Sequence, residues 1–147
     1  MPPLDEQAVL EFMRLLWGLD HALQKRSKWM ASMTGVTGPQ RLALRLIGFE
    51  PAISAGRLAS GLCVHPSTLT GVLRRLESKG LVRRRAVPGD RRRTILALTR
   101  PGRAAAGLST HSVEHAVTQA LARARAGSVR VTSELLRSLT SALERRG

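Results

Sequence analysis

The feature that most constrains the fold is a single change of periodicity in a chain that otherwise has helical spacing. Up to about residue 80, apolar residues recur at intervals of three and four, as they do on amphipathic helices. Residues 81–87 and 93–99 instead read as two strands on either side of Pro88-Gly89-Asp90, which predicts a β-hairpin. Helical spacing resumes after Thr99. The sequence therefore predicts a mainly α fold with one small β-hairpin.

Capping residues, prolines and glycines divide the helical stretches into six expected helices. The clearest boundary is Thr37, because Gln40 completes a capping box with it and Pro39 falls in the first turn. The expected helices are residues 5–33, residues 37–48, a short helix capped by Ser54, residues 66–79, residues 99–126, and a last helix with Leu135, Leu136, Leu139 and Leu143 on one face.

Three short helices followed by a basic hairpin have the layout of a winged helix-turn-helix, which we expect over residues 37–99. The flanking segments, residues 1–36 and 100–147, carry apolar faces that such a small domain does not need. A second copy of the chain is the simplest partner for these faces. We therefore expect one domain over residues 1–147, with both flanking segments as dimerisation helices of a homodimer.

Positive charge is concentrated in one part of the chain. The protein has 24 basic and 10 acidic side chains, for a net charge of +14. Residues 74–103 alone hold 11 basic and 2 acidic side chains, a net charge of +9. Because a high arginine content can also reflect a compositional bias of the source, the location of the charge carries more weight than its total. A localised basic patch indicates a polyanionic partner, with an ordinary solvated surface as the alternative.

The helix expected over residues 66–79 has one apolar stripe, formed by Leu69, Val72, Leu73 and Leu76. Its other faces carry small hydroxyls and arginines: Ser67, Thr68, Thr70, Gly71, Arg74, Arg75 and Ser78. Short side chains let a helix approach a major groove closely, hydroxyls bind phosphates or base edges, and arginine binds guanine with two hydrogen bonds. An ordinary solvated face would mix Glu and Lys, yet Glu77 is the only acid in this helix. The pattern predicts a recognition helix.

The hairpin expected over residues 82–98 carries arginines on both sides of its turn. They are Arg83, Arg84, Arg85, Arg91, Arg92 and Arg93. A hairpin tip is thin enough to enter a minor groove, where arginine is the favoured side chain. We therefore expect DNA contacts from Asp90, Arg91, Arg92 and Arg93. Asp90 either holds a neighbouring guanidinium or initiates the turn, and both roles are compatible.

Residues 62–99 resemble the MarR family of winged helix-turn-helix transcription regulators. The matching residues are Ser67-Thr68-Leu69-Thr70, Arg75-Leu76-Glu77, Lys79-Gly80-Leu81-Val82, Asp90-Arg91-Arg92, and Leu98-Thr99 followed by Gly102. The resemblance implies a homodimer held by the first, fifth and sixth helices. It also implies binding to pseudo-palindromic duplex DNA, often relieved by a small anionic or aromatic effector.

By the same resemblance, Ser67, Thr68, Thr70 and Arg75 lie on the recognition helix. Arg92 takes the position of the minor-groove arginine of the hairpin, steadied by Asp90. Gly71 departs from the family pattern, because the position after Thr70 often carries a long polar or basic residue. The bases that the helix reads are therefore left open.

The sequence offers little for an enzyme, a metal centre or a cofactor. It has no phosphate-binding loop, no dinucleotide-binding glycine motif and no complete nucleophile elbow. His111 and His115 lack a third ligand, so a polar helix face is favoured over zinc. No segment reaches the roughly 20 apolar residues of a membrane span, and no secretion signal is recognisable, so we expect a cytoplasmic protein.

Two further features have competing interpretations. Trp17, Trp29 and Met33 line either an effector pocket beside the first helix or a packed core or dimer interface. A small core residue is the favoured interpretation of Cys63, and a redox role is left open. The function predicted from the sequence is a homodimeric, sequence-specific, duplex-DNA-binding regulator, most simply a repressor. The alternative is a non-specific basic architectural DNA-binding protein; at 3% aromatic residues the chain lacks the stacking platforms of single-strand binders.

Overall fold

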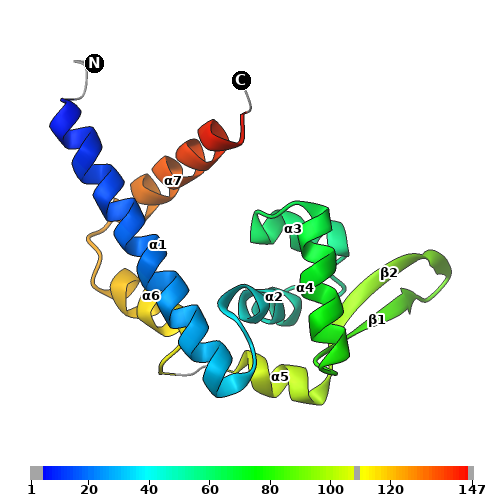
Figure 1. The fold of residues 1–147 in the computed structure, drawn as a ribbon. Coiled ribbons are helices and arrows are strands. Elements are labelled where there is room, and N and C mark those ends of the chain that lie inside the picture. The colour runs from blue at the N-terminus through cyan, green and yellow to red at the C-terminus, as the bar shows by residue number, and fades with distance from the viewer. Residues whose placement is uncertain (1–4, 108–109, 146–147) are drawn as a thin grey trace. The chain divides into compact units, whose positions relative to one another are not determined.

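The computed structural model describes residues 5–107 and 110–145, apart from the side chain of Arg91. The chain forms two units, residues 1–109 and 110–147, and each is described by itself (Figure 1). The elements are α1 (Glu6–Thr34), α2 (Gly38–Phe49), α3 (Ala55–Leu62), α4 (Pro66–Ser78), β1 (Val82–Val87), β2 (Asp90–Leu98), α5 (Arg100–Ala106), α6 (Val113–Ala122) and α7 (Ser128–Glu144). The mainly helical fold with one antiparallel hairpin is confirmed.

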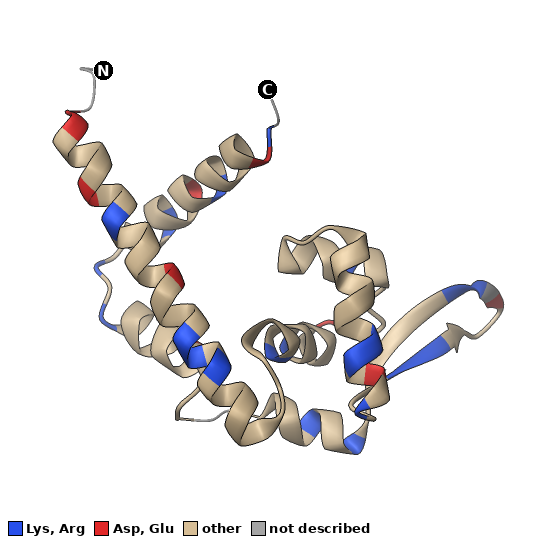
Figure 2. Ribbon diagram, in the orientation of Figure 1, with Lys and Arg blue, Asp and Glu red and all other residues tan. Residues whose placement is uncertain are grey.

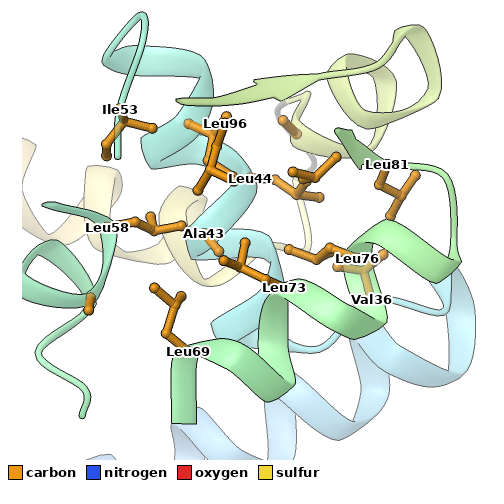
Figure 3. Packing of buried hydrophobic residues seen from close by; sticks show 14 residues of the cluster. Val36, Ala43, Leu44, Ile53, Leu58, Leu69, Leu73, Leu76, Leu81 and Leu96 are labelled. Carbon is orange, nitrogen blue, oxygen red and sulfur yellow. The ribbon is translucent and has the colours of Figure 1, made fainter. Parts of the chain in front are cut away.

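The core of the first unit lies between α2, α3, α4 and the base of the hairpin (Figure 3). Leu44, Leu58, Leu73 and Leu76 are fully buried there. Burial of one such side chain contributes about 1.5–3 kcal/mol. Because the apolar stripe of α4 is buried in this core, the opposite face of the helix must point to solvent. The sequence-based prediction of that stripe is confirmed, with Val72 only partly buried.

Local capping signals form as expected. The Thr37 hydroxyl accepts from Gln40 N at 3.4 Å, and the Gln40 side chain accepts from Thr37 N at 3.3 Å, which completes the capping box. Ser54 caps α3 through Arg57 N, and Thr99 caps α5 through Gly102 N. These bonds satisfy backbone N–H groups that have no partner inside their helices.

The hairpin is tied to the helices at its base. β1 pairs with β2 from Val82 opposite Leu98 to Val87 opposite Asp90, with a register shift between Ala86 and Val87. Leu96 is buried, and its N–H donates to Ile53 O at 2.9 Å in the connection between α2 and α3. The rest of the hairpin extends beyond the helices of this unit (Figure 1).

The fifth helix is shorter than the sequence pattern suggested. We expected it to continue to about residue 126, but α5 ends at Ala106 and a separate helix, α6, begins at Val113 with Ser112 as its N-cap. Gly107 is the C-cap of α5 and Ser112 caps α6, and two arginines of α2 also donate to the last carbonyls of α5. Arg41 binds Ala105 O at 2.7 Å and also Gly107 O, and Arg45 binds Ala106 O at 3.2 Å. In a continuous helix those carbonyls would accept backbone N–H groups instead.

The second unit consists of two helices with little buried surface. Among its described residues only Ser112 is buried, and every residue of α6 and α7 is at least partly exposed. Gly127 has a left-handed backbone (φ +82°) and separates the two helices, as its position in the sequence suggested. None of the described helices is both long and apolar enough to cross a lipid bilayer.

Candidate nucleic-acid interface

The outer face of α4 gathers all five residues expected on a recognition helix. Each of them is exposed: Ser67, Thr68, Thr70, Arg74 and Arg75. The helix begins at Pro66, behind His65, whose Nδ1 accepts from Ser67 N at 3.3 Å. Within the described part of the chain, no carboxylate pairs with Arg74 or Arg75. Both guanidiniums are therefore available to an anionic partner.

The hydroxyls on this face are partly engaged within the helix. Thr70 donates its only hydroxyl proton to Pro66 O at 3.0 Å, so it presents acceptor lone pairs outward. The Ser67 hydroxyl lies 2.8 Å from His65 Nδ1, and because Nδ1 also accepts from Ser67 N it carries no proton, so the hydroxyl is the donor. This end of α4 can thus accept hydrogen bonds from exocyclic amines of bases, while the arginines further along supply donors.

Gly71 lies between these two parts of the face. A Cβ built there would meet no atom within 4 Å, so no packing against the protein requires a glycine. Its small size leaves the helix backbone open to a partner that comes close.

The hairpin adds a second basic surface beside α4. The described arginine side chains Arg83, Arg84, Arg85, Arg92 and Arg93 are all exposed. Figure 2 shows basic residues along β1, at the end of β2 next to the turn, and in the second half of α4. Asp90 at the tip accepts from Arg92 N at 3.0 Å. The turn-forming role of Asp90 is therefore observed, and none of the described ion pairs joins it to a guanidinium.

Two polar ties that hold this surface in place were missed by sequence reasoning. Arg84 Nε of β1 donates to Glu77 Oε1 of α4 at 2.8 Å. Lys79, the C-cap of α4, donates to Gly35 O at the end of α1 and to Gln40 Oε1 of the capping box at 3.4 Å. The lysine thereby links α1, α2 and α4. Its only sequence signal is a basic residue before Gly80, which indicates a helix end and not a partner 44 residues away.

The residues expected for an effector pocket are all on α1, but the structure does not gather them. Trp17 lines a shallow apolar hollow with Leu10, Met13 and Arg14. Trp29 lies 12 residues further on, about 18 Å along the helix axis, and Arg26 sits over its ring at 5.9 Å. Met33 is exposed near the end of α1. The alternative that they pack in the core of this unit does not hold, because all three side chains are exposed.

The interpretation of Cys63 as a core residue is wrong. Cys63 is the C-cap of α3 with a left-handed backbone (φ +53°), and it is exposed. This conformation ends α3 and turns the side chain to solvent. As for metals, no cluster of three or more His, Cys, Asp or Glu side chains occurs among the described residues. His115 contacts Gln119 at 3.0 Å, as on a polar helix face.

The known proteins that this chain resembles in sequence are transcription regulators. The family model "MarR family" matches residues 36–94. The HTH-type transcriptional repressor Rv2887 of Mycobacterium tuberculosis is 32% identical over 127 residues, which are 86% of this chain and 91% of that protein. The transcriptional regulator HosA of Escherichia coli is 34% identical over 79 residues, 54% of this chain. That second match spans 58% of HosA, a little over half its length.

Solved structures give the same result for the fold. The S. aureus MepR–DNA complex has a TM-score of 0.72 with 18% identity, and the similarity covers 90% of this chain and 98% of that one. The structure of Rv2887 with salicylic acid has a TM-score of 0.56 with 32% identity, covering 85% of this chain and 93% of that one.

Proposed function

The chain belongs to the MarR family of DNA-binding transcription regulators, and from this premise we propose that it is a homodimeric repressor of a pseudo-palindromic duplex operator. The observation that carries the proposal is the exposed face of α4, with hydroxyls at one end and arginines at the other. A regulator of this kind meets its operator in the cytoplasm, which is the location we infer.

In this proposal α4 occupies the major groove, and the hairpin follows the DNA into the adjacent minor groove. Ser67, Thr68 and Thr70 contact base edges or phosphates near the N-terminus of α4. Arg74 and Arg75 bind guanine or phosphate further along the helix. At the hairpin, Arg92 is the minor-groove side chain, flanked by Arg91 and Arg93, and the bond from Arg92 N to Asp90 fixes the backbone that presents it.

The dimer is supported by apolar side chains that remain exposed in a single chain. Of the 29 residues of α1 only Met30 is buried, and Trp17 is 65% exposed. On α7, Leu135, Leu136 and Leu143 are exposed, and Leu143 reaches 77%. Exposed apolar stripes of this extent indicate a protein partner, and a second copy of the chain makes both recognition helices available to two half-sites.

Relief by a small ligand is a further part of the proposal. The Rv2887 structure is a complex with salicylic acid, and this chain is 32% identical to that protein. We expect an anionic aromatic effector beside α1, either near Trp17 or near Trp29 and Met33, because these two places lie about 18 Å apart along the helix. The protein has two tryptophans, both on α1. Binding should therefore quench Trp fluorescence and weaken operator binding together; quenching without loss of DNA affinity would argue against an effector site.

The deciding experiment is selection of bound duplexes from a random pool, followed by affinity measurements on the enriched sequence and on its isolated half-site. We expect a pseudo-palindrome with half-sites about 10 base pairs apart, bound much more tightly than one half-site. The main alternative, a non-specific architectural protein, predicts no enriched sequence and an affinity that depends only on duplex length and salt.

A further inference from the structure

Glu77 is a carboxylate in a surface that otherwise attracts DNA. It is the only acid of α4, and residues 74–103 contain 11 basic residues with Asp90 as the only other acid. Asp90 has a local role in the hairpin turn. Glu77 lies in the last turn of α4, where a carboxylate repels the phosphates that the surrounding arginines attract. Its presence there calls for a physical reason.

The structure supplies a specific contact. Arg84 Nε donates to Glu77 Oε1 at 2.8 Å, and the two side chains are 46% and 31% exposed. The pair joins α4 to β1, the first strand of the hairpin. Its neighbours Arg83 and Arg85 are exposed and have no ion pair among the described residues. Of three consecutive arginines on β1, one is therefore held by α4 and two are left to solvent.

The ion pair is not the only link between α4 and β1, because the backbone also connects them through a tight turn. Gly80 turns the chain with a left-handed backbone (φ +66°), and Leu81 N donates to Leu76 O at 3.0 Å. This turn fixes where β1 begins. At the base of β2, Leu96 N also donates to Ile53 O at 2.9 Å. The ion pair adds a direct attachment of β1 to α4 further along the strand, at residue 84. It thereby restricts movement of the hairpin relative to α4, and hence the distance between a major-groove helix and a minor-groove hairpin.

We propose that Glu77 is a positioning residue for operator discrimination. Its ion pair with Arg84 fixes the hairpin against α4 and withholds one guanidinium from non-specific phosphate contacts. This rests on the proposed function, namely that α4 and the hairpin bind duplex DNA. Exposed ion pairs contribute little to folding stability, so the effect is expected in DNA binding.

The expected size follows from counterion release. Each phosphate neutralised on duplex DNA adds about 0.9 to the slope of log affinity against log salt. Glu77→Gln frees Arg84 for one more phosphate, so the slope for a non-specific duplex should steepen by about 0.9. Over the tenfold range from 1 M to 0.1 M salt, this corresponds to roughly eightfold tighter non-specific binding at 0.1 M. Operator affinity should rise less or fall, because the freed hairpin no longer has one fixed position.

The chain offers a matched control in the same unit. Glu50, the C-cap of α2, pairs with Arg57 of α3 at 3.3 Å, and Glu50→Gln removes the same charge and an equivalent ion pair. Non-specific and operator affinities of the full-length parent, Glu77→Gln and Glu50→Gln should be measured by fluorescence anisotropy across a salt series. We expect the operator preference to fall about tenfold in Glu77→Gln and to change little in Glu50→Gln.

Identical behaviour of the two Gln variants, or an equal loss of both affinities in Glu77→Gln, would overturn the inference. The double variant Glu77→Gln/Arg84→Gln separates the two roles of the pair: non-specific affinity should return to near the parent level, whereas the operator preference should stay reduced. A double variant with parental preference would refute the positioning role. A parent protein without any operator preference would instead refute the proposed function itself, so the two failures are distinguishable.

Discussion

Replacing Gly102 with alanine should damage the fold severely, because α5 passes directly over the backbone of Leu81. A Cβ at Gly102 would stand 1.9 Å from Leu81 O and 2.9 Å from Leu81 C. Real Cβ atoms essentially never approach other heavy atoms within 3.0 Å, and the obstructing atoms here belong to the backbone. Either the first turn of α5 or the start of the hairpin must therefore shift.

The cost can be worked out from the bonds that meet at this point. Leu81 O accepts from Thr99 N at 3.1 Å, and the Thr99 hydroxyl donates to the neighbouring Gly80 O at 2.6 Å while it caps α5 by accepting from Gly102 N at 3.1 Å. Each lost hydrogen bond costs about 0.5–1.5 kcal/mol, a lost cap about 1 kcal/mol and overpacking about 1–3 kcal/mol. Because the losses overlap, we expect about 3–5 kcal/mol out of a total stability of roughly 5–15 kcal/mol.

The assay is urea unfolding followed by far-ultraviolet circular dichroism at one fixed protein concentration, because association shifts apparent stability. Gly71→Ala is the matched control, since it adds the same methyl group to a helix where nothing lies within 4 Å. That variant should gain about 0.5–1 kcal/mol from helix propensity. A Gly102→Ala protein that unfolds at the parental midpoint would refute the reasoning.

Three further changes test other parts of the structure. Lys79→Met removes the bonds from α4 to Gly35 O and Gln40 and should lower the free energy of unfolding by about 1–2 kcal/mol; an unchanged urea midpoint would show that the contact is not stabilising. Arg92→Ala should weaken operator binding by about 1–3 kcal/mol, whereas Asp90→Asn, which keeps an acceptor for Arg92 N, should bind nearly normally; equal losses would contradict this division of roles. Deletion of residues 128–147 should yield monomers with little operator affinity, and a truncated protein that sediments as a dimer and binds normally would exclude α7 from the dimer interface.

Features set by near neighbours in the sequence were predictable. Thr37, Ser54 and Thr99 cap helices because the N–H groups they bind lie three residues away, so the signal and its partner share one short window. The apolar stripe and outer face of α4 follow from helical geometry alone. The family was predictable for a related reason: the matched residues 62–99 form one continuous unit. Membership in a family of transcription regulators also confirms the choice of a regulator over an enzyme.

Features set by distant partners were not predictable. Arg41 and Arg45, more than 60 positions earlier in the chain, donate to the last carbonyls of α5 and hold its end. The spacing of apolar residues after Thr99 does not reveal these contacts, so the predicted helix continued to residue 126 instead of ending at Ala106. The ties of Lys79 to Gly35 and of Glu77 to Arg84 were missed for the same reason: a single charged residue does not reveal its partner.

Periodicity identifies an apolar face but not what covers it. For this reason, the apolar faces of the terminal helices suggested a dimer, although their spacing is the same as that of core helices. Leucines of α2, α3 and α4 and those of α1 and α7 recur with the same helical spacing. The first group fills one core, where Leu44, Leu58 and Leu76 are fully buried, whereas Leu15, Leu135 and Leu143 remain exposed. Three short helices and the base of one hairpin already enclose the interior of the DNA-binding unit, so further apolar stripes find no room in it. Their burial requires a surface outside this core, and under the proposed dimer a second copy of the chain supplies that surface together with a second α4.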